Sequence, residues 1–511
     1  MSTSRLLCCA TLLLAVCPVM PAAAQSVLEV RVTDPAGAPV SGARVHVSTR
    51  DARLTVATDT DAEGLARVDV ECDCVLEVRA EGFSPASTVV TGTDQRIDVP
   101  LAIAGVAERV VVTATGTAQT AAEATKAIDV VEAAEIRTRG EFAVGDALRT
   151  LPGLTVQQLG GPGTFTSIKM RGLREQDTLI LLDGEPLRDA TAPKGDSTGV
   201  IGELYLTNLD RVEVLRGSGS SVHGTHAVAG AVNLITRHGG GPLAGETSVE
   251  AGQLGFTRAA GYAGGAAGRL AYSIGAGRTH TSRGVDGDDE SDNTSLQGRA
   301  DLRVGASAQL SVRTYLSDGT VSLNESPSAI GPLPAQGTVR AVPLSTFVPS
   351  VNDPDARRES EFGSSSVSFD HRPTARAGYG VSFRHAGTAR VFLDGPLGVS
   401  AFEPARQNST VLDGGLTTFV ARGDFELATN QTVSARYERE HETYESEAFP
   451  APGPPQWSAD LRQTRQTVSL QHQWRGSTWH VASGVRGETF SLDRAQLAPA
   501  DRSPFAGATF E

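Results

Sequence analysis

Residues 209–236, LDRVEVLRGSGSSVHGTHAVAGAVNLIT, decide the fold. Apolar and polar side chains alternate along residues 209–216, which predicts a β-strand with two different faces. A segment rich in glycine and serine follows and breaks the alternation, because such residues favour turns. Residues 229–237 then predict a second strand. The stretch therefore indicates a β-structure whose strands carry charged side chains among apolar ones.

Two segments upstream extend this pattern. Residues 141–148 predict a short helix that ends at Leu151-Pro152-Gly153. Residues 178–182 (TLILL) predict a buried strand, and the Asp183-Gly184 pair after them predicts a tight turn. Strands and short helices in this order indicate a small α+β domain.

The order of these motifs resembles the plug domain of TonB-dependent outer-membrane receptors. Any one motif alone is a weak signal, but together, in this order and spacing, they are specific. The resemblance implies a plug domain over residues 120–240. The motifs that carry it are Leu151-Pro152-Gly153-Leu154, Met170-Arg171-Gly172, Leu182-Asp183-Gly184, RVEVLRG at 211–217 and GAVNLIT at 230–236.

Charged residues within these motifs need a physical account, because an unpaired charge in a dry core is costly. Inside a wide, water-lined barrel such groups can pair with polar residues of the wall. We interpret Arg171, Asp183, Glu213 and Arg216 as plug–barrel docking groups, not as catalysts. A structural role within the plug and a role in gating both stay open for them. Gly172, Gly184 and Gly217 follow them in the same motifs.

The linker at residues 107–116 contains a short β-prone run. Taken alone, it is an ordinary internal strand or a strand that adds to a partner's sheet edge. By the resemblance, it stands where the family keeps its TonB box, the strand offered to the energy-coupling protein in the periplasm. The TonB-box-like residues are Glu108, Arg109, Val110, Val111, Val112 and Thr113.

Residues 243–511 repeat a hairpin rhythm with about eleven strand-like runs. Short turns alternate with long loops, which is the rule for transmembrane β-barrels; a soluble sandwich explains the strands but not this alternation. No run of about 20 apolar residues lies beyond the N-terminus, so no ordinary transmembrane helix is predicted. The resemblance implies 22 strands, so we expect the first half of an incomplete antiparallel transmembrane β-barrel. The expected fold class is mainly β.

The N-terminal part predicts an exported protein with a small accessory domain. Residues 1–24 have the basic start, apolar core and small-residue end of a signal peptide. Residues 26–102 alternate with period two between turns, which predicts a small β-sandwich. The motifs VTDPAGAPVSGA at 32–43, TDAEG at 60–64 and VRAEGF at 78–83 resemble the carboxypeptidase regulatory-like (transthyretin-like) module. Such modules are usually non-catalytic.

Evidence for a metal or catalytic site is weak. The acidic residues Asp286, Asp288, Asp289 and Glu290 are weak candidates for calcium, because they lack EF-hand spacing. Cys72 and Cys74 lack further zinc ligands, and their redox state stays open. The run at 441–445 (HETYE) lacks the second histidine of a zinc peptidase. We expect no cofactor and no enzyme. The net charge of −14 and the lack of a basic cluster argue against nucleic acid.

The resemblance implies a TonB-dependent outer-membrane receptor, and we expect it to be a monomer. The resemblance implies import of a scarce ligand, such as a siderophore or cobalamin, by energy-coupled plug rearrangement. Its expected partners are a TonB-type protein in the periplasm, outer-membrane lipid and an unknown small-molecule ligand, with the N-terminal domain periplasmic. The alternative is a surface adhesin or envelope-assembly protein that binds through the N-terminal sandwich.

Overall fold

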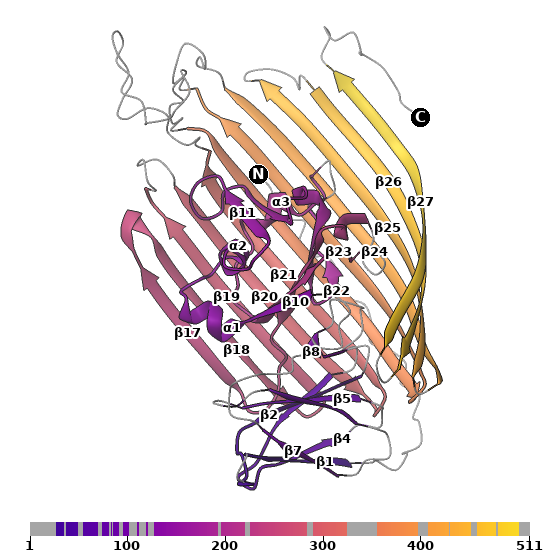
Figure 1. Cartoon of the computed structure of the whole chain (residues 1–511). Coiled ribbons are helices and arrows are strands. Elements are labelled where there is room, and N and C mark those ends of the chain that lie inside the picture. The colour runs from indigo at the N-terminus through magenta and orange to yellow at the C-terminus, as the bar shows by residue number, and fades with distance from the viewer. Residues whose placement is uncertain are drawn as a thin grey trace.

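The computed structural model has three parts: an N-terminal sandwich, a plug and a large curved sheet that surrounds the plug on one side (Figure 1). It describes residues 27–34, 37–49, 55–69, 74–80, 83, 85–90, 96–101, 110–111, 119–120, 127–192, 196–219, 225–283, 290–323, 355–396, 407–428, 430–450, 457–476 and 479–499. Among these residues no helix has the length and apolar character needed to cross a membrane.

The sandwich consists of two sheets with strand orders β4-β1-β7 and β3-β2-β5-β6. Alternating valines and leucines point between the sheets, and Val30, Val45 and Leu76 are fully buried there. Cys74 is buried and takes part in a disulfide. The strands are β1 (Val27–Thr33), β2 (Arg44–Thr49), β3 (Thr55–Asp59), β4 (Leu65–Asp69), β5 (Cys74–Arg79), β6 (Ala86–Val90) and β7 (Arg96–Pro100).

The plug is built on a mixed sheet of order β10-β15-β16-β13-β14. All seven residues of β16 are buried, because it lies in the middle of the sheet between β15 and β13. Its strands are β10 (Ala127–Glu132), β13 (Thr178–Leu182), β14 (Glu185–Pro186), β15 (Leu209–Arg216) and β16 (Gly230–Thr236), with a hairpin of β11 (Leu154–Gln158) and β12 (Thr166–Met170). The helices are α1 (Ala133–Thr138), α2 (Val144–Leu148) and α3 (Thr198–Ile201), with short 3-10 turns η1 (Glu175–Asp177) and η2 (Thr225–Ala227).

The large sheet contains eleven strands, each antiparallel to the next in chain order. Tight turns join alternate pairs, and Gly268 and Gly305 take the left-handed conformation that such turns require. The strands are β17 (Ala244–Ala251), β18 (Thr257–Ala267), β19 (Leu270–Thr281), β20 (Ser291–Val304), β21 (Ala308–Ser322), β22 (Arg357–Thr374), β23 (Ala377–Asp394), β24 (Asn408–Ala428), β25 (Gln431–Pro450), β26 (Trp457–Arg475) and β27 (His480–Pro499). The short turn η3 (Gln253–Gly255) follows β17.

Side chains of the large sheet alternate between its two faces. On β21, Val312 and Leu316 are exposed on the convex face, whereas their neighbours Ser311 and Ser317 are buried on the concave face. Beyond Leu316, away from the tight turn, the exposed positions become polar. The mainly β class predicted from the sequence, with a plug and an antiparallel sheet, is confirmed.

Candidate functional site: the seam between plug and sheet

The seam is the interface between the plug and the concave face of strands β19–β25. One of its contacts is made by the Asp183-Gly184 turn, which the sequence predicts. Asp183 and Gly184 have positive φ values of 50° and 82°, which is the geometry of a two-residue hairpin turn. The Asp183 N–H donates to Leu234 O at 2.9 Å, and the Gly184 N–H donates to Asn233 Oδ1 at 2.9 Å. The turn is therefore fixed by β16, and it directs the Asp183 carboxylate toward the sheet.

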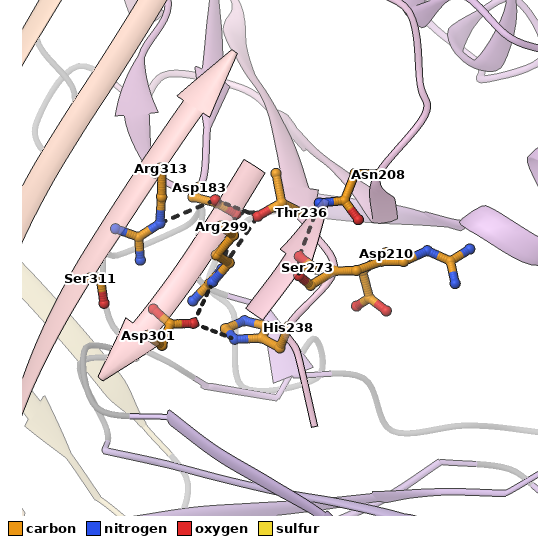
Figure 2. A network of polar contacts seen from close by, with 12 residues as sticks. Asp183, Asn208, Asp210, Thr236, His238, Ser273, Arg299, Asp301, Ser311 and Arg313 are labelled. Atoms are coloured by element: carbon orange, nitrogen blue, oxygen red, sulfur yellow. Dashed lines mark hydrogen bonds and ion pairs between the residues drawn. The ribbon is translucent and has the colours of Figure 1, made fainter. Parts of the chain in front are cut away.

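Asp183 is a buried anion that bridges plug and sheet (Figure 2). Its Oδ1 lies 3.5 Å from Arg299 Nη1 of β20, and its Oδ2 lies 3.2 Å from Arg313 Nε of β21. Thr236 donates to it from its backbone N–H at 2.9 Å and its hydroxyl at 2.6 Å. Burial acts to raise the pKa of Asp183, but the two guanidinium groups and the Thr236 hydrogen bonds outweigh it and hold the pKa below its ordinary value.

The network continues along the sheet toward the sandwich. Arg299 Nε donates to Asp301 Oδ2 at 2.6 Å, and Gln309 Nε2 donates to Asp301 Oδ1 at 3.2 Å. His238, which follows β16, places Nδ1 3.7 Å from the same carboxylate (Figure 2). The Asp183 contact is therefore one end of a polar chain that reaches the start of the sheet.

Further ion pairs join the plug to later strands. Glu203 accepts from Arg358 Nη2 of β22 at 2.7 Å, and Asp189 pairs with Arg390 of β23. At β25 the charges are exchanged, so that the sheet carries the acid and the plug the arginine. Glu440 accepts from Arg188 of the plug at 2.5 Å. Plug acids thus face arginines on β20–β23, and a plug arginine faces an acid on β25.

Neutral contacts fill the seam between these pairs. The Tyr315 hydroxyl donates to Glu203 O at 2.8 Å and accepts from the Tyr205 N–H at 3.2 Å. The Asn208 N–H donates to Gln297 Oε1 at 3.0 Å. Side chains of β20 and β21 thus hydrogen-bond directly to the plug backbone.

The other predicted docking groups lie elsewhere in the plug. Glu213 is fully buried and accepts from Arg211 Nε and Nη2, at 3.0 and 2.8 Å, within the same strand. Arg216 pairs with Asp129 of β10 at 2.6 Å, because β15 and β10 are neighbours in the plug sheet. The structure therefore pairs both residues with other residues of the plug.

Arg171 is exposed at the end of β12. Its N–H donates to Gly153 O at 2.7 Å, and its φ of 53° is followed by 73° at Gly172. Gly217 has a φ of 124° and donates its N–H to Ala229 O at 3.0 Å. In the structure these residues form turns that connect the plug motifs.

Sequence reasoning missed the plug residues Arg188, Asp189 and Glu203. All three are buried and pair with the sheet. A signal was present, because charged residues follow directly on the buried strand and turn at 178–184. Their partners lie between 155 and 252 residues away along the chain, so the pairing itself left no local pattern.

The remaining predicted site residues are described only in part. Val110 and Val111 form β8 (Val110–Val111), which pairs antiparallel with β9 (Gln119–Thr120). Glu108, Arg109, Val112 and Thr113 lie outside the described residues, as do Asp286, Asp288 and Asp289. Glu290 is exposed, and its carbonyl oxygen accepts from the Ser322 N–H at 2.8 Å. Where the structure describes the chain, no three His, Cys, Asp or Glu side chains are grouped to hold a metal.

Known proteins share these parts. The family description "TonB-dependent Receptor Plug Domain" matches residues 120–231, and "Carboxypeptidase regulatory-like domain" matches residues 27–102. An iron-regulated outer membrane virulence protein of Vibrio cholerae is 39% identical over 133 residues, which are 25% of this chain and 20% of that protein. The vitamin B12 transporter BtuB of Photobacterium profundum is 28% identical over 207 residues, which are 39% of this chain and 33% of the transporter. The alignments thus span a third or less of these relatives.

Solved structures share the fold. The pyoverdine receptor FpvA of Pseudomonas aeruginosa superimposes with a TM-score of 0.61 at 17% identity, covering 75% of this chain and 59% of the receptor. The ferric citrate transporter FecA superimposes with a TM-score of 0.59 at 15% identity, covering 74% and 59%. The plug is therefore similar in sequence to the plug domain of TonB-dependent receptors, and the antiparallel sheet is similar in fold to these solved structures.

Proposed function

We propose that this protein imports a scarce ligand, an iron–siderophore complex or a molecule of the cobalamin class, across the bacterial outer membrane. The observation that carries the proposal is the plug domain seated against a curved antiparallel sheet and joined to it by ion pairs. Similar proteins are named for the transport or binding of vitamin B12, ferric citrate and pyoverdine, which supports this ligand class. Members of the family are receptors and transporters, not enzymes.

The two faces of the large sheet support its place in the outer membrane. Large apolar side chains are exposed on the convex face, among them Val381, Phe383, Phe419 and Leu470, while polar side chains fill the concave face. Apolar-out and polar-in alternation is the pattern of a transmembrane barrel. We propose that lipid covers the apolar half of the strands, next to the tight turns, and that the polar half extends outward.

The sandwich lies at the end of the sheet that carries the tight turns (Figure 1). If those turns face the periplasm, as barrel architecture implies, the sandwich is periplasmic. We propose a monomer with a signal peptide at 1–24, the sandwich at 26–102, the TonB-box-like linker at 107–116, the plug at 120–240 and the barrel from 243 onward.

The polar seam suits a plug that has to move. A buried ion pair contributes little net stability, because desolvation offsets the attraction. If the seam opens to water, each charged group regains hydration, so separation costs less than separation of an apolar interface of the same size. We infer that the seam holds the plug in one position at rest and lets it shift under a pull applied through residues 108–113.

The experiment uses a substitution within β8. Val111→Pro removes a backbone N–H and so prevents strand addition to a TonB-type partner. Val111→Ile retains the N–H and the β-branched side chain, and it serves as the matched control. Cells that carry Val111→Pro should bind radiolabelled ferric citrate, ferripyoverdine or cobalamin as the unmodified protein does but should not import it.

Import by Val111→Pro at the rate of the Val111→Ile control would contradict energy coupling through this segment. Absence of uptake of all three probes by the unmodified protein would contradict the proposed ligand class.

A further inference from the structure

One face of the sandwich is docked on the plug. The outer face of the β3-β2-β5-β6 sheet carries Arg44, His46, Ala57 and Arg79, because these positions alternate with core residues such as Val45 and Val78. This face contacts β10 and β15 of the plug and the segment 238–241 that leads into the large sheet. The sandwich and the plug therefore share a specific interface.

Arg79 forms the ionic centre of that interface. Its Nη1 lies 3.3 Å from Glu132 Oε2 at the end of β10 and 3.5 Å from Asp210 Oδ2 in β15. Glu77, beside it on β5, holds the guanidinium at 2.9 Å. One sandwich cation thus bridges two plug strands, and its side chain is only 22% exposed.

Glycines let the lead-in segment pass close to the sandwich. A Cβ at Gly240 would lie 2.9 Å from the Ala57 Cβ, so only glycine allows this approach without a shift. Arg44 Nη2 donates to Gly240 O at 3.2 Å. The His46 and His238 rings meet edge to face, with centroids 5.7 Å apart. The sandwich therefore contacts both the plug and the start of the wall.

The chain segment that connects the sandwich to the plug determines how a pull would act on this interface. Residues 102–126 join the sandwich, whose last strand ends at Pro100, to β10 of the plug, which begins at Ala127. The TonB-box-like residues lie in this connection. Both ends of the connection belong to bodies that Arg79 holds together, so a pull on it acts across the docked interface.

We propose that the N-terminal sandwich is a releasable latch: docked, it holds the plug sheet in place, and it has to part from the plug during import. The proposal rests on the import function proposed above. The polar, part-exposed character of the Arg79 bridge suits repeated release, because its charges regain water when it opens. Arg79 acts as a positioning residue and touches no ligand.

A reversible covalent lock tests the latch. Cysteines at Ala57 and Gly240 are close enough for a disulfide after a small outward shift, because disulfide Cβ atoms lie about 3.5–4.5 Å apart. In intact protein, Ala57→Cys/Gly240→Cys should oxidise to a locked form that binds radiolabelled ferripyoverdine, ferric citrate or cobalamin, whichever the unmodified protein imports. Import by the locked form should fall to the level of cells without the protein and return after reduction. The two single-cysteine variants, under the same oxidant, are controls and also report exchange with Cys74.

Import by the locked form at the rate of the reduced form would overturn the latch. If the reduced and single-cysteine proteins bind the probe but do not import it, the import function itself fails, and the latch fails with it.

A second measurement tests docking without import. In the double-cysteine protein, Arg79→Gln should lower the yield of the crosslink by about fivefold, the upper end for a part-exposed ion pair. Arg67→Gln, which removes an exposed arginine from the opposite sheet of the sandwich, is the matched control and should leave the yield unchanged. Equal yields from Arg79→Gln and Arg67→Gln would show that the Arg79 bridge does not hold the sandwich.

Discussion

At the scale of single residues, Asp183 contributes most to the seam. Its side chain is 4% exposed and faces two arginines of the sheet, so its loss removes the carboxylate that pairs with Arg313 and leaves Arg299 paired with Asp301 alone. Asp183→Asn should lower the free energy needed to open the plug sheet by about 3–5 kcal/mol, the usual cost of breaking a buried ion pair. Hydrogen exchange of β13 and β16 amides measures this as a lower opening free energy.

The control for that substitution is Asp413→Asn, at an exposed position on β24. Equal protection of the plug sheet in Asp183→Asn and the unmodified protein would show that the ion pairs do not hold the plug.

The histidine pair should make docking of the sandwich depend on pH. Burial lowers the pKa of both His46 and His238. The charges of His238, Arg79 and Arg44 lower the pKa of His46 further, and the charge of Arg299 lowers the pKa of His238 further. Asp210 beside His46, and Asp301 and Asp183 beside His238, act in the opposite sense. The docked state thus favours neutral rings, so docking is strongest above the ordinary histidine pKa of about 6.5 and weakens as pH falls below it toward the lowered values.

Spin labels at the exposed positions Glu63 and Leu173 report this equilibrium. The label-to-label distance should be single at about pH 7.5 and broaden at about pH 5.5, across the range where histidine titrates. The double variant His46→Gln/His238→Gln should show little change over the same range. An unchanged distance in the unmodified protein at both pH values would contradict the prediction.

At the scale of elements, the segment between β16 and β17 passes close to the backbone of β19. A Cβ at Gly239 would overlap the Tyr272 backbone nitrogen and oxygen in β19, and neither atom is able to move aside. Gly239→Ala should therefore destabilise the protein by at least about 1–3 kcal/mol, the usual cost of overpacking. A lower Tm measures this effect, whereas Gly161→Ala, whose Cβ meets nothing within 4 Å, should leave Tm unchanged.

Elements with strong local patterns were predictable from the sequence. Alternation and tight turns predicted the eleven strands of the large sheet, and residues 178–184 predicted β13 and its turn. The expected helix at 141–148 is shorter in the structure, as α2, and α1 and β10 had no prediction. Both helices have five or six residues and no side-chain cap, so packing against the plug sheet, not local propensity, forms them.

The candidate site was predictable only where a residue lies in a turn. Asp183-Gly184 stands out because its backbone needs a left-handed turn. The partners of Asp183 could not be predicted, because Arg299 and Arg313 reach it only through the register and curvature of β20 and β21. The sequence also does not reveal that β15 lies between β10 and β16 in the plug sheet. It therefore could not predict the plug partners of Glu213 and Arg216, for which contacts with the barrel are predicted.

At the scale of the whole molecule, the plug is held from two sides. The curved sheet contacts it through Asp183, Asp189, Glu203 and Arg188, and the sandwich contacts it through Arg79. Ion pairs and hydrogen bonds cross both interfaces, and buried apolar contacts of Ala190 with Ala386 and Leu416 also join the plug to the sheet. The charged groups regain water when either interface opens. Ligand passage should therefore depend on motion of the plug relative to the sheet.

A tether between plug and sheet measures that dependence most directly. A Cβ at Gly277 of β19 would lie 2.8 Å from the Thr207 Cγ2 of the plug and 3.6 Å from the nearest backbone atom, so Thr207→Cys/Gly277→Cys should form a disulfide across the seam. The oxidised protein should bind a radiolabelled probe that the unmodified protein imports but should not import it, and reduction should restore import. Import by the oxidised, tethered protein at the rate of its reduced form would contradict transport by plug rearrangement.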